Sequence, residues 1–364
     1  MALRLIHFAD LHLDRSFAAE RLYGAGAQRR RTDLRAALER IIQRARDEHA
    51  DLITCGGDLF EHDHVTRDTA SFLTQTLGNA GMPVLIAPGN TDPAMPSSPY
   101  RYLRWPSNVT IAAHEELRPY RYNDVQIWSA GFMRPEMPDA SLRDFARQES
   151  GVNLLLLHAS DMSQVPEGVT PYKPILPGQV EEAGFRHALL GHYHDARSSA
   201  LITYPGSPEP LGWQETGRHC TALATVSDEG HVEVALQDIN ARQFAQETID
   251  ITGMTGVEQV RDAVFAMRDG KQLDGAVLRA TLVGERARSL NLDPEALATE
   301  CSDGFAYVEF RDRSRISHDV DSVAQEFTSR GEMVRKLVEH KSESRQEEQA
   351  VGRALQLALD AFDE

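Results

Sequence analysis

The stretch at residues 51–64, DLITCGGDLFEHDH, places one carboxylate, Asp58, directly after a short apolar run. Residues 52–55 predict a buried strand, and Gly56-Gly57 lets the backbone turn tightly before the acid. In open α/β sheets, ligands bind at the carboxyl ends of the strands. For one Gly-Asp pair alone, a helix N-cap or a turn aspartate is the commoner explanation. Asp58 is therefore a candidate site residue only because of the residues around it.

The chain on either side of this stretch alternates between strand and helix. Apolar runs predict strands at residues 3–9, 51–56 and 83–87, and helical spacing of apolar residues predicts helices at residues 28–48 and 67–77. This order is typical of a parallel, right-handed α/β layer. Asp10, Asp58 and Asn90 each follow one of these strands, so we expect them at one edge of the sheet.

The next part of the chain carries further β-structure. Three prolines predict that residues 91–106 form a loop without a helix. Strands are predicted at residues 109–112, 125–130, 152–157, 187–190, 200–204, 220–226 and 232–236, and a short helix at residues 141–147. The last strands, joined by a turn at residues 228–230, are expected to form antiparallel edge structure.

The pattern changes near residue 246. Alternating strands and helices at residues 246–316 predict a small α+β domain, and residues 317–364 predict a helical tail. The predicted organisation is a catalytic domain at residues 1–245, a capping domain at 246–316 and a tail at 317–364.

Composition narrows the class of protein. The chain has 364 residues, 41% of them apolar and 26% charged, as in soluble proteins. No apolar run approaches the roughly 20 residues that span a bilayer, and the first residues become polar too early for a signal peptide. We therefore expect a cytoplasmic protein without a membrane partner. Three widely separated cysteines, Cys55, Cys220 and Cys301, are expected to be free thiols.

The net charge of −17 opposes nonspecific attraction to nucleic acid. It does not exclude a nuclease, because bound divalent cations supply positive charge locally. Two basic segments are candidate contacts: Arg29-Arg30-Arg31, for which a solvated helix face is the favoured explanation, and residues 100–105, where tyrosines and a tryptophan flank two arginines. The second segment fits a DNA contact and a packed loop equally well.

Potential metal ligands follow the predicted strands one after another. Alternate residues of an extended chain point to the same side, so Asp-x-His and His-x-His can each reach one centre. Carboxylate, amide and imidazole groups together suit two divalent ions such as Mn²⁺. The candidate ligands are Asp10, His12, Asp58, Asn90, His158, His192 and His194.

These segments show a resemblance. DLH at residues 10–12, GGD at 56–58, PGN at 88–90, LLLH at 155–158 and GHYH at 191–194 resemble the five metal-binding blocks of the calcineurin-like metallophosphoesterases. FADLHLD at residues 8–14 and GGDLF at 56–60 are most similar to the SbcD-type DNA repair nucleases, the family of the Mre11 nuclease. The motif match covers residues 4 to about 210.

The resemblance implies an α/β sandwich with a small α+β cap domain and a C-terminal helical tail. It also implies that one ion is held by Asp10, His12 and His194, a second by Asn90, His158 and His192, and that Asp58 bridges them. Mn²⁺ as the working ion, DNA as the substrate, an SMC-like ATPase as partner and a homodimer are implied in the same way.

The sequence departs from the family at the expected proton donors. Family members usually have Gly-Asn-His-Asp where this chain has Gly89-Asn90-Thr91-Asp92, and Glu61 stands where the repair nucleases often have a second histidine. Threonine is not a useful acid near neutral pH. Either His62 or the nearby His64 supplies the proton, or hydrolysis is feeble. The candidate catalytic residues are Asp58, His62, Thr91 and Asp92.

These observations predict a two-metal DNA nuclease acting in DNA repair. A phosphodiesterase or phosphatase acting on other substrates is an alternative, because the metal blocks alone do not choose the substrate. A weakly active DNA-binding or scaffold subunit is another alternative. Thr91 supports it, because threonine stands where the family usually has a histidine. The helical tail either docks on the ATPase or packs on the cap domain.

Overall fold

The computed structural model describes residues 3–136, 142, 145, 151–340 and 345–363. The chain divides into two compact units, Met1–Phe244 and Ala245–Glu364. None of the helices in the described part combines the length and apolarity that a membrane span requires.

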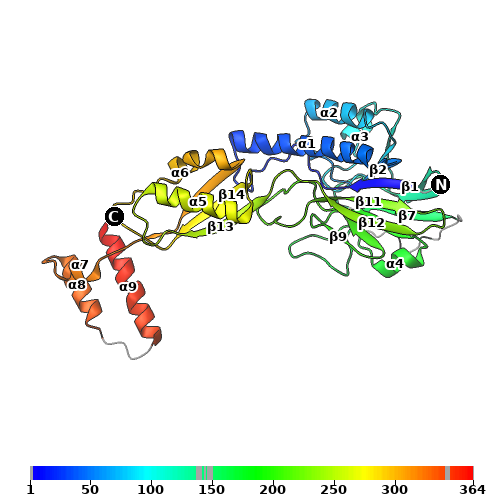
Figure 1. Ribbon diagram of the computed structural model, residues 1–364. Coiled ribbons are helices and arrows are strands. Elements are labelled where there is room, and N and C mark those ends of the chain that lie inside the picture. Colours follow the sequence, from blue (N-terminus) through cyan, green and yellow to red (C-terminus); the bar gives the residue numbers. More distant parts are fainter. Residues whose placement is uncertain (1–2, 137–141, 143–144, 146–150, 341–344, 364) are drawn as a thin grey trace. The chain divides into compact units, whose positions relative to one another are not determined.

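The first unit contains a six-stranded sheet in the order β12-β11-β1-β2-β3-β4. Strands β1 to β4 are parallel, and β11 runs antiparallel to β1 and β12. Helices α1 (Gly24–Asp47) and α2 (Arg67–Gly78) cover one face of this sheet (Figure 1). The strands span Leu3–Phe8 (β1), Leu52–Cys55 (β2), Val84–Ile86 (β3), Val109–Ile111 (β4), Cys220–Val226 (β11) and Val232–Asp238 (β12).

A second six-stranded sheet has the order β5-β6-β7-β8-β10-β9. Its four inner strands are parallel, and its edge strands β5 and β9 are antiparallel to their neighbours. Helix α4 (Pro177–Glu182) packs on this sheet through the buried side chain of Val180. The strands span Arg118–Tyr122 (β5), Val125–Ser129 (β6), Val152–His158 (β7), His187–Gly191 (β8), Arg197–Ser198 (β9) and Ile202–Tyr204 (β10).

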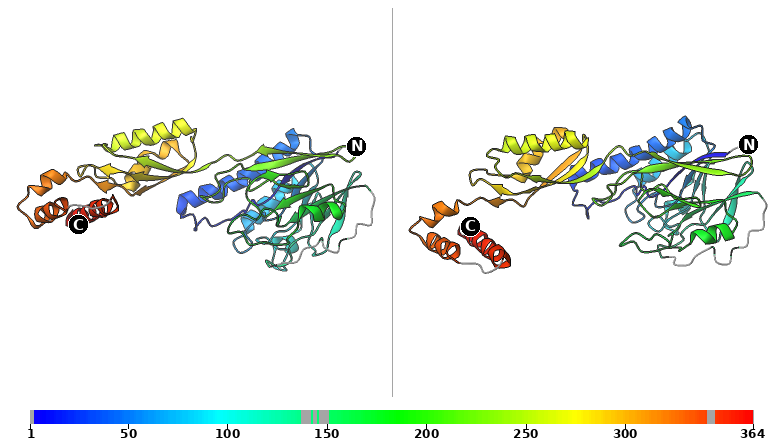
Figure 2. Two further views of the ribbon diagram at one scale, coloured as in Figure 1. Left: turned by 90° about the horizontal axis from the view of Figure 1, so that it is seen from below. Right: turned by 60° about the horizontal axis from the view of Figure 1, so that its bottom comes forward.

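The two sheets pack face to face through one buried apolar cluster. Leu5 and Leu52 from the first sheet meet Ile127, Leu154 and Leu189 from the second. Burial of such side chains contributes about 1.5–3 kcal/mol each. The α/β class and the sandwich expected from the sequence are thereby confirmed (Figure 2).

The second unit has its own core. A three-stranded sheet, β13-β14-β16, packs with α5 and α6 around Leu278, Leu282 and Phe310. Helices α7 to α9 form a separate small apolar cluster of Val323, Val334 and Leu359. The elements are β13 (Phe244–Asp250), α5 (Val257–Lys271), β14 (Val277–Val283), β15 (Glu285–Arg286), α6 (Pro294–Glu300), the 3₁₀ turn Ser302–Gly304, β16 (Tyr307–Asp312), β17 (Arg315–Ile316), α7 (Val320–Ala324), α8 (Ser329–Val338) and α9 (Arg345–Asp363).

Some local predictions were wrong. Residues 91–106 contain a one-turn helix, α3 (Pro99–Tyr102), because Ser98 caps it and proline suits the first helical position. Strand β5 and helix α4 were not predicted, and β10 pairs in parallel with β8 although antiparallel structure was expected. The helix predicted at residues 141–147 falls mostly on residues outside the described ranges.

One residue of the arginine triplet, Arg30, differs from the prediction of a solvated helix face, while Arg29 is exposed as predicted. Arg30 is buried, with its guanidinium bonded to Asp33, Glu209 and the carbonyl of Pro210. It therefore ties α1 to the loop that follows β10, and this is a structural role.

Candidate metal centre

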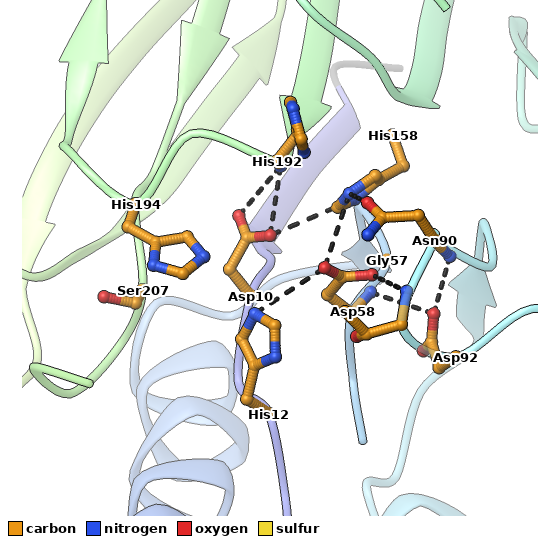
Figure 3. Close-up of polar contacts among 12 residues, drawn as sticks. Asp10, His12, Gly57, Asp58, Asn90, Asp92, His158, His192, His194 and Ser207 are labelled. Carbon is orange, nitrogen blue, oxygen red and sulfur yellow. Dashed lines mark hydrogen bonds and ion pairs between the residues drawn. The ribbon is translucent and has the colours of Figure 1, made fainter. Parts of the chain in front are cut away.

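The predicted ligands meet where strands of both sheets end. Asp10 follows β1, Asp58 follows β2 and Asn90 follows β3, while His158 ends β7 and His192 follows β8. Figure 3 shows the carboxylates of Asp10 and Asp58 between His194 on one side and His158 with Asn90 on the other. The sequence predicted that candidate ligands would gather at one edge of the first sheet. The structure adds candidate ligands from the second sheet at the same place.

Glycines allow the two strand ends to approach this closely. Gly57 has φ +96°, and a Cβ atom there would lie 2.8 Å from both Gly89 N and His158 Nδ1. Any other residue at position 57 would force these groups apart. Gly56 likewise faces Gly191 N at 2.8 Å from its ideal Cβ position.

Four of the candidate ligands have a left-handed backbone. The φ angles are +55° at Asp10, +49° at His12, +53° at Asp58 and +106° at His192. Such conformations are strained for residues other than glycine, and they persist when neighbouring contacts enforce them. Here Asp10 N donates to Gly57 O at 3.0 Å and His12 N donates to Asp58 O at 2.9 Å.

Two groups of donors are close enough to hold an ion each. One consists of Asp10, His12 and His194, and the other of Asp10, Asp58 and His158, with the ligand atoms of each group within 4.8 Å of one another. The first group matches the expected first-ion ligands. Asp10 belongs to both groups. The family resemblance implied Asp58 as the shared ligand, and Asp58 Oδ2 lies 3.6 Å from His12 Nε2 and 3.5 Å from His158 Nε2.

In the first group, both histidines contact a carboxylate. His12 Nδ1 lies 2.9 Å from Glu61 Oε1, and His194 Nδ1 lies 2.7 Å from Glu215 Oε1. Burial opposes the imidazolium form of His194, but the hydrogen bond and charge of Glu215 outweigh it and raise its pKa to about 9. Each ring therefore has its Nε2 atom directed away from its glutamate.

The second group is built around His158. Its Nδ1 lies 2.8 Å from Gly56 O, and its Nε2 lies 2.9 Å from Asn90 Oδ1 and 3.5 Å from Asp58 Oδ2. Burial lowers the pKa of His158, which favours the neutral ring that binds metals. Asn90 is thereby placed beside the second group, with its amide oxygen next to His158 Nε2.

His192 lies at the edge of the site. Its backbone N–H donates to both oxygens of Asp10 at 3.0 Å, and its ring centroid lies 5.1 Å from that of His158. Its Nε2 contacts the carbonyl of Thr170 at 3.0 Å, which leaves Nδ1 as the other ring nitrogen. Burial, with the adjacent His158, lowers the pKa of His192 to about 4.

The central carboxylates have opposite pKa shifts. Burial raises the pKa of Asp10 to about 6, with His194 opposing the rise and Asp58 adding to it. Burial also opposes ionisation of Asp58, but His158 and His12 outweigh it and lower its pKa. Two buried acids side by side repel one another, and a cation between them relieves that repulsion.

Asp92 holds the backbone that carries Asp58. Its carboxylate accepts hydrogen bonds from Asp58 N at 3.0 Å, Leu59 N at 2.7 Å and Gly89 N at 2.6 Å, and from the Tyr100 hydroxyl at 2.6 Å. Burial raises the pKa of Asp92, and these donors oppose the rise. Asp92 therefore acts as a positioning residue through the backbone of Asp58.

The two remaining catalytic candidates, Thr91 and His62, lie beside the potential metal ligands. Thr91 N donates to Asp58 Oδ1 at 2.9 Å, so the backbone of Thr91 orients that carboxylate. His62 N donates to Thr91 O at 2.9 Å, and its ring Nε2 lies 3.2 Å from Ser97 Oγ. His62 is thus next to Thr91 but outside both donor groups.

Some residues of the site gave no signal in the sequence. Glu215 lies 21 positions after His194. Tyr100 belongs to the segment 100–105, and its bond to Asp92 makes it a packed residue, whereas Arg101, Tyr102 and Arg104 are exposed. Lys173 is buried beside Phe132, with its ammonium 4.6 Å from the ring centroid and 3.1 Å from Gly131 O. Neither spacing nor hydrophobic pattern indicates such contacts.

The residues present fit divalent cations. His12 Nε2 is buried, is 3.6 Å from Asp58 Oδ2 and has no hydrogen-bond partner among the described residues. A buried ring nitrogen without a partner is costly, and a metal ion would satisfy it. Imidazole, carboxylate and amide donors are those of borderline divalent ions.

The chain is similar in sequence to known phosphoesterases. The family model of the calcineurin-like phosphoesterases matches residues 3–195. An uncharacterized metallophosphoesterase, YhaO, of Bacillus subtilis is 27% identical over 72% of this chain and 68% of its own length. DNA double-strand break repair proteins Mre11 of Methanopyrus kandleri and Haloferax volcanii are each 23% identical, over 86% and 87% of this chain and 71% and 69% of their own lengths.

The matched residues include every candidate ligand from Asp10 to His194. Members of this family hydrolyse phosphate esters with divalent metal ions, and the two donor groups are placed for that chemistry. This chain belongs to the calcineurin-like phosphoesterases.

Proposed function

We propose that this chain is a cytoplasmic, metal-dependent DNA nuclease that acts in DNA repair with Mn²⁺ as its working ion. The observation that carries the proposal is the pair of donor groups that share Asp10 at the joined ends of the two sheets. The choice of DNA is supported by the similarity to the Mre11 proteins, which extends over most of both units.

Two divalent ions, when bound, activate a water molecule and stabilise charge on the attacking and leaving oxygens of a phosphodiester. The chain itself supplies the geometry. Asp10 and Asp58 provide negative charge between the histidines, and Asp92 fixes the loop of Asp58 through three backbone N–H groups. The Thr91 amide holds Asp58 in one orientation. Preorganised donors of this kind avoid reorganisation during the reaction.

His62 is the proposed source of the proton for the leaving oxygen. Its backbone is bonded to Thr91, and its ring Nδ1 is buried without a hydrogen-bond partner among the described residues. A positioned acid contributes about 10²–10⁴-fold. His62→Ala should therefore slow Mn²⁺-dependent cleavage at least tenfold, with Asp63→Ala, an exposed neighbour, as control; equal rates in wild type and His62→Ala would reject this role.

The decisive experiment compares wild type with Asp58→Ala on single- and double-stranded DNA, with Mn²⁺, Mg²⁺ or Zn²⁺. Asp58→Ala should lower the rate at least 10³-fold, because it removes the central carboxylate from the ion site. Asp63→Ala, an exposed aspartate five positions later, is the matched control and should retain full activity. Cleavage that survives Asp58→Ala would contradict the proposal.

A phosphodiesterase acting on other substrates is a second candidate. The net charge of −17 disfavours binding to a polyanion, and this observation favours a small phosphoester. Parallel assays with bis-p-nitrophenyl phosphate, cyclic nucleotides and phosphorylated peptides discriminate the two. Turnover of these compounds without any cleavage of DNA would select the second candidate.

A metal-bound scaffold or DNA-binding subunit with feeble hydrolysis is favoured by one observation, the threonine at position 91. Thr91→His would restore the residue usual in the family. In a feeble enzyme, this change should raise the rate sharply while leaving the amount of bound metal unchanged. An unchanged rate in Thr91→His would count against this candidate.

For partners, we propose an SMC-like ATPase and a second copy of this chain. The tail carries exposed apolar side chains, with exposed fractions of 103% at Phe327 between α7 and α8, and of 70% at Leu357 and 50% at Phe362 in α9. Such side chains favour docking to a partner. A chain lacking residues 317–364 should lose capture of the ATPase in a pull-down but keep hydrolysis; retained capture would refute docking through the tail. Light scattering of the full chain tests the dimer.

A further inference from the structure

Glu61 and Glu215 contact the two histidines of only one donor group. The distances are 2.9 Å from Glu61 Oε1 to His12 Nδ1 and 2.7 Å from Glu215 Oε1 to His194 Nδ1. A carboxylate that accepts from the Nδ1–H of a ligating histidine fixes the tautomer, orients the ring and makes the other nitrogen a stronger donor. In both pairs, that other nitrogen is Nε2.

The backbone holds Glu61 in place beside His12. Leu13 N donates to Leu59 O at 3.0 Å, and Glu61 N donates to Leu13 O at 2.9 Å, so the two segments run together as a short ladder. The side chain of Glu61 is 21% exposed, and Arg15 lies 3.8 Å from the oxygen that contacts His12. Glu61 is thus a fixed carboxylate in a mostly buried position.

The loop after β10 fixes Glu215 equally firmly. Its second oxygen accepts from Ser207 Oγ at 2.9 Å and from Leu211 N at 2.8 Å, while Ser207 N donates to His194 O at 3.0 Å. Both oxygens of Glu215 are therefore engaged. The side chain is 17% exposed, so water competes little for these bonds.

His158 of the second group and the adjacent His192 lack this arrangement among the described residues. His158 Nδ1 contacts the backbone carbonyl of Gly56 at 2.8 Å, and His192 Nε2 contacts that of Thr170 at 3.0 Å. A neutral carbonyl polarises an imidazole less than a carboxylate does. The two groups therefore differ in the charge behind their histidines.

We propose that Glu61 and Glu215 are positioning residues that make the Asp10–His12–His194 group the tighter of two unequal ion sites. The inference rests on the proposed two-ion function. It adds which of the two ion sites binds its ion more tightly. It also gives a role to Glu61, which stands where the related nucleases often have a histidine. In this chain Glu61 orients the candidate ion ligand His12.

Titration of the metal-free full chain with Mn²⁺, followed by calorimetry and by electron paramagnetic resonance of free Mn²⁺, tests the inference without substrate. Wild type should bind two ions in two affinity classes. Glu61→Gln and Glu215→Gln should each weaken the tighter class about 10–100-fold and leave the weaker class unchanged. Glu233→Gln, which alters an exposed glutamate 3.6 Å from His231, is the matched control and should bind as wild type.

Further variants assign the classes to their groups. Asn90→Ala should weaken the weaker class alone, because Asn90 belongs beside His158. Glu61→His should act like Glu61→Gln, since it removes the carboxylate. Circular dichroism of each metal-free variant checks that it is folded. If Glu215→Gln unfolds because its hydrogen bonds with Ser207 and Leu211 are lost, the Mn²⁺ affinities of Glu61→Gln alone decide the inference.

The outcomes separate the inference from the proposed function. Unchanged affinities in Glu61→Gln, or loss of the weaker class in place of the tighter one, would overturn the inference and leave the two-ion site standing. A wild type that binds no ion would overturn both.

Discussion

Single residues in this site are held by contacts that the sequence does not reveal. The gathering of the candidate ligands could be predicted, because they follow apolar runs in a recognisable strand pattern. Glu215 and Tyr100 could not, because their partners His194 and Asp92 are chosen by loop geometry. The same holds for Lys173, whose burial depends on the packing of Phe132 against it.

Lys173→Met should stabilise the protein near neutral pH. Burial lowers the pKa of Lys173 from 10.5 to about 8, so the unfolded chain holds this proton more tightly than the folded chain. The charge therefore destabilises the fold below pH 8, and the cost disappears as the pH rises from 8 toward 10.5. The gain in free energy of unfolding should be about 1–3 kcal/mol at pH 7 and smaller at pH 9.5.

Urea denaturation followed by tryptophan fluorescence measures this difference in the metal-free chain. Arg186→Met, which changes an exposed cation in the same unit as the tryptophans, is the control, and we expect it to stay within about 0.5 kcal/mol of wild type at both pH values. A gain in the free energy of unfolding of Lys173→Met that is constant or grows with pH would contradict the lowered pKa of Lys173.

At the scale of elements, strands were predicted better than short helices. The strands β1, β2, β3, β7 and β8 are buried apolar runs, so their type follows from pattern alone. Helix α3 depends on one serine cap and one proline within a stretch rich in prolines, and its hydrogen bonds outweigh the general signal for a loop. That small helix matters to the site because it carries Tyr100 to Asp92.

Tyr100→Phe should weaken the connection between α3 and the two ligand loops. It removes the hydroxyl that donates to Asp92 at 2.6 Å and leaves a buried carboxylate with one donor fewer. We expect a loss of about 1.5–3 kcal/mol in the free energy of unfolding. Chemical denaturation detects it, and Tyr102→Phe on the same helix, 59% exposed, should behave as wild type. Equal stability of Tyr100→Phe and Tyr102→Phe would speak against the role of this bond.

At the scale of the whole molecule, the apolar cores of the two units are made of different residues. The core of Met1–Phe244 contains every candidate ligand at its edge, and Ala245–Glu364 has its own clusters around Leu278 and Val334. A change of pattern near residue 246 was visible in the sequence. The packing of α7 to α9 on one another was not predicted, because short apolar stripes do not specify which surface covers them.

We expect the two units to unfold in separate transitions, of which metal affects one. All three tryptophans, Trp105, Trp128 and Trp213, lie in Met1–Phe244, so their fluorescence follows that unit, while circular dichroism follows both. Mn²⁺ at 100 times its dissociation constant should stabilise the fluorescent transition by about 2.7 kcal/mol per site. A single transition common to both probes, or an equal shift of both, would contradict this expectation.

The position of β1 in the first sheet has a consequence for synthesis on the ribosome. β1 pairs with β2 on one side, but its other side pairs with β11, which ends at Val226. The nascent chain therefore exposes one unpaired edge of β1 until that residue emerges, and an exposed edge is prone to join other chains. His194 and Glu215 also emerge late, so ions can enter a complete site only after about two thirds of the chain has been translated.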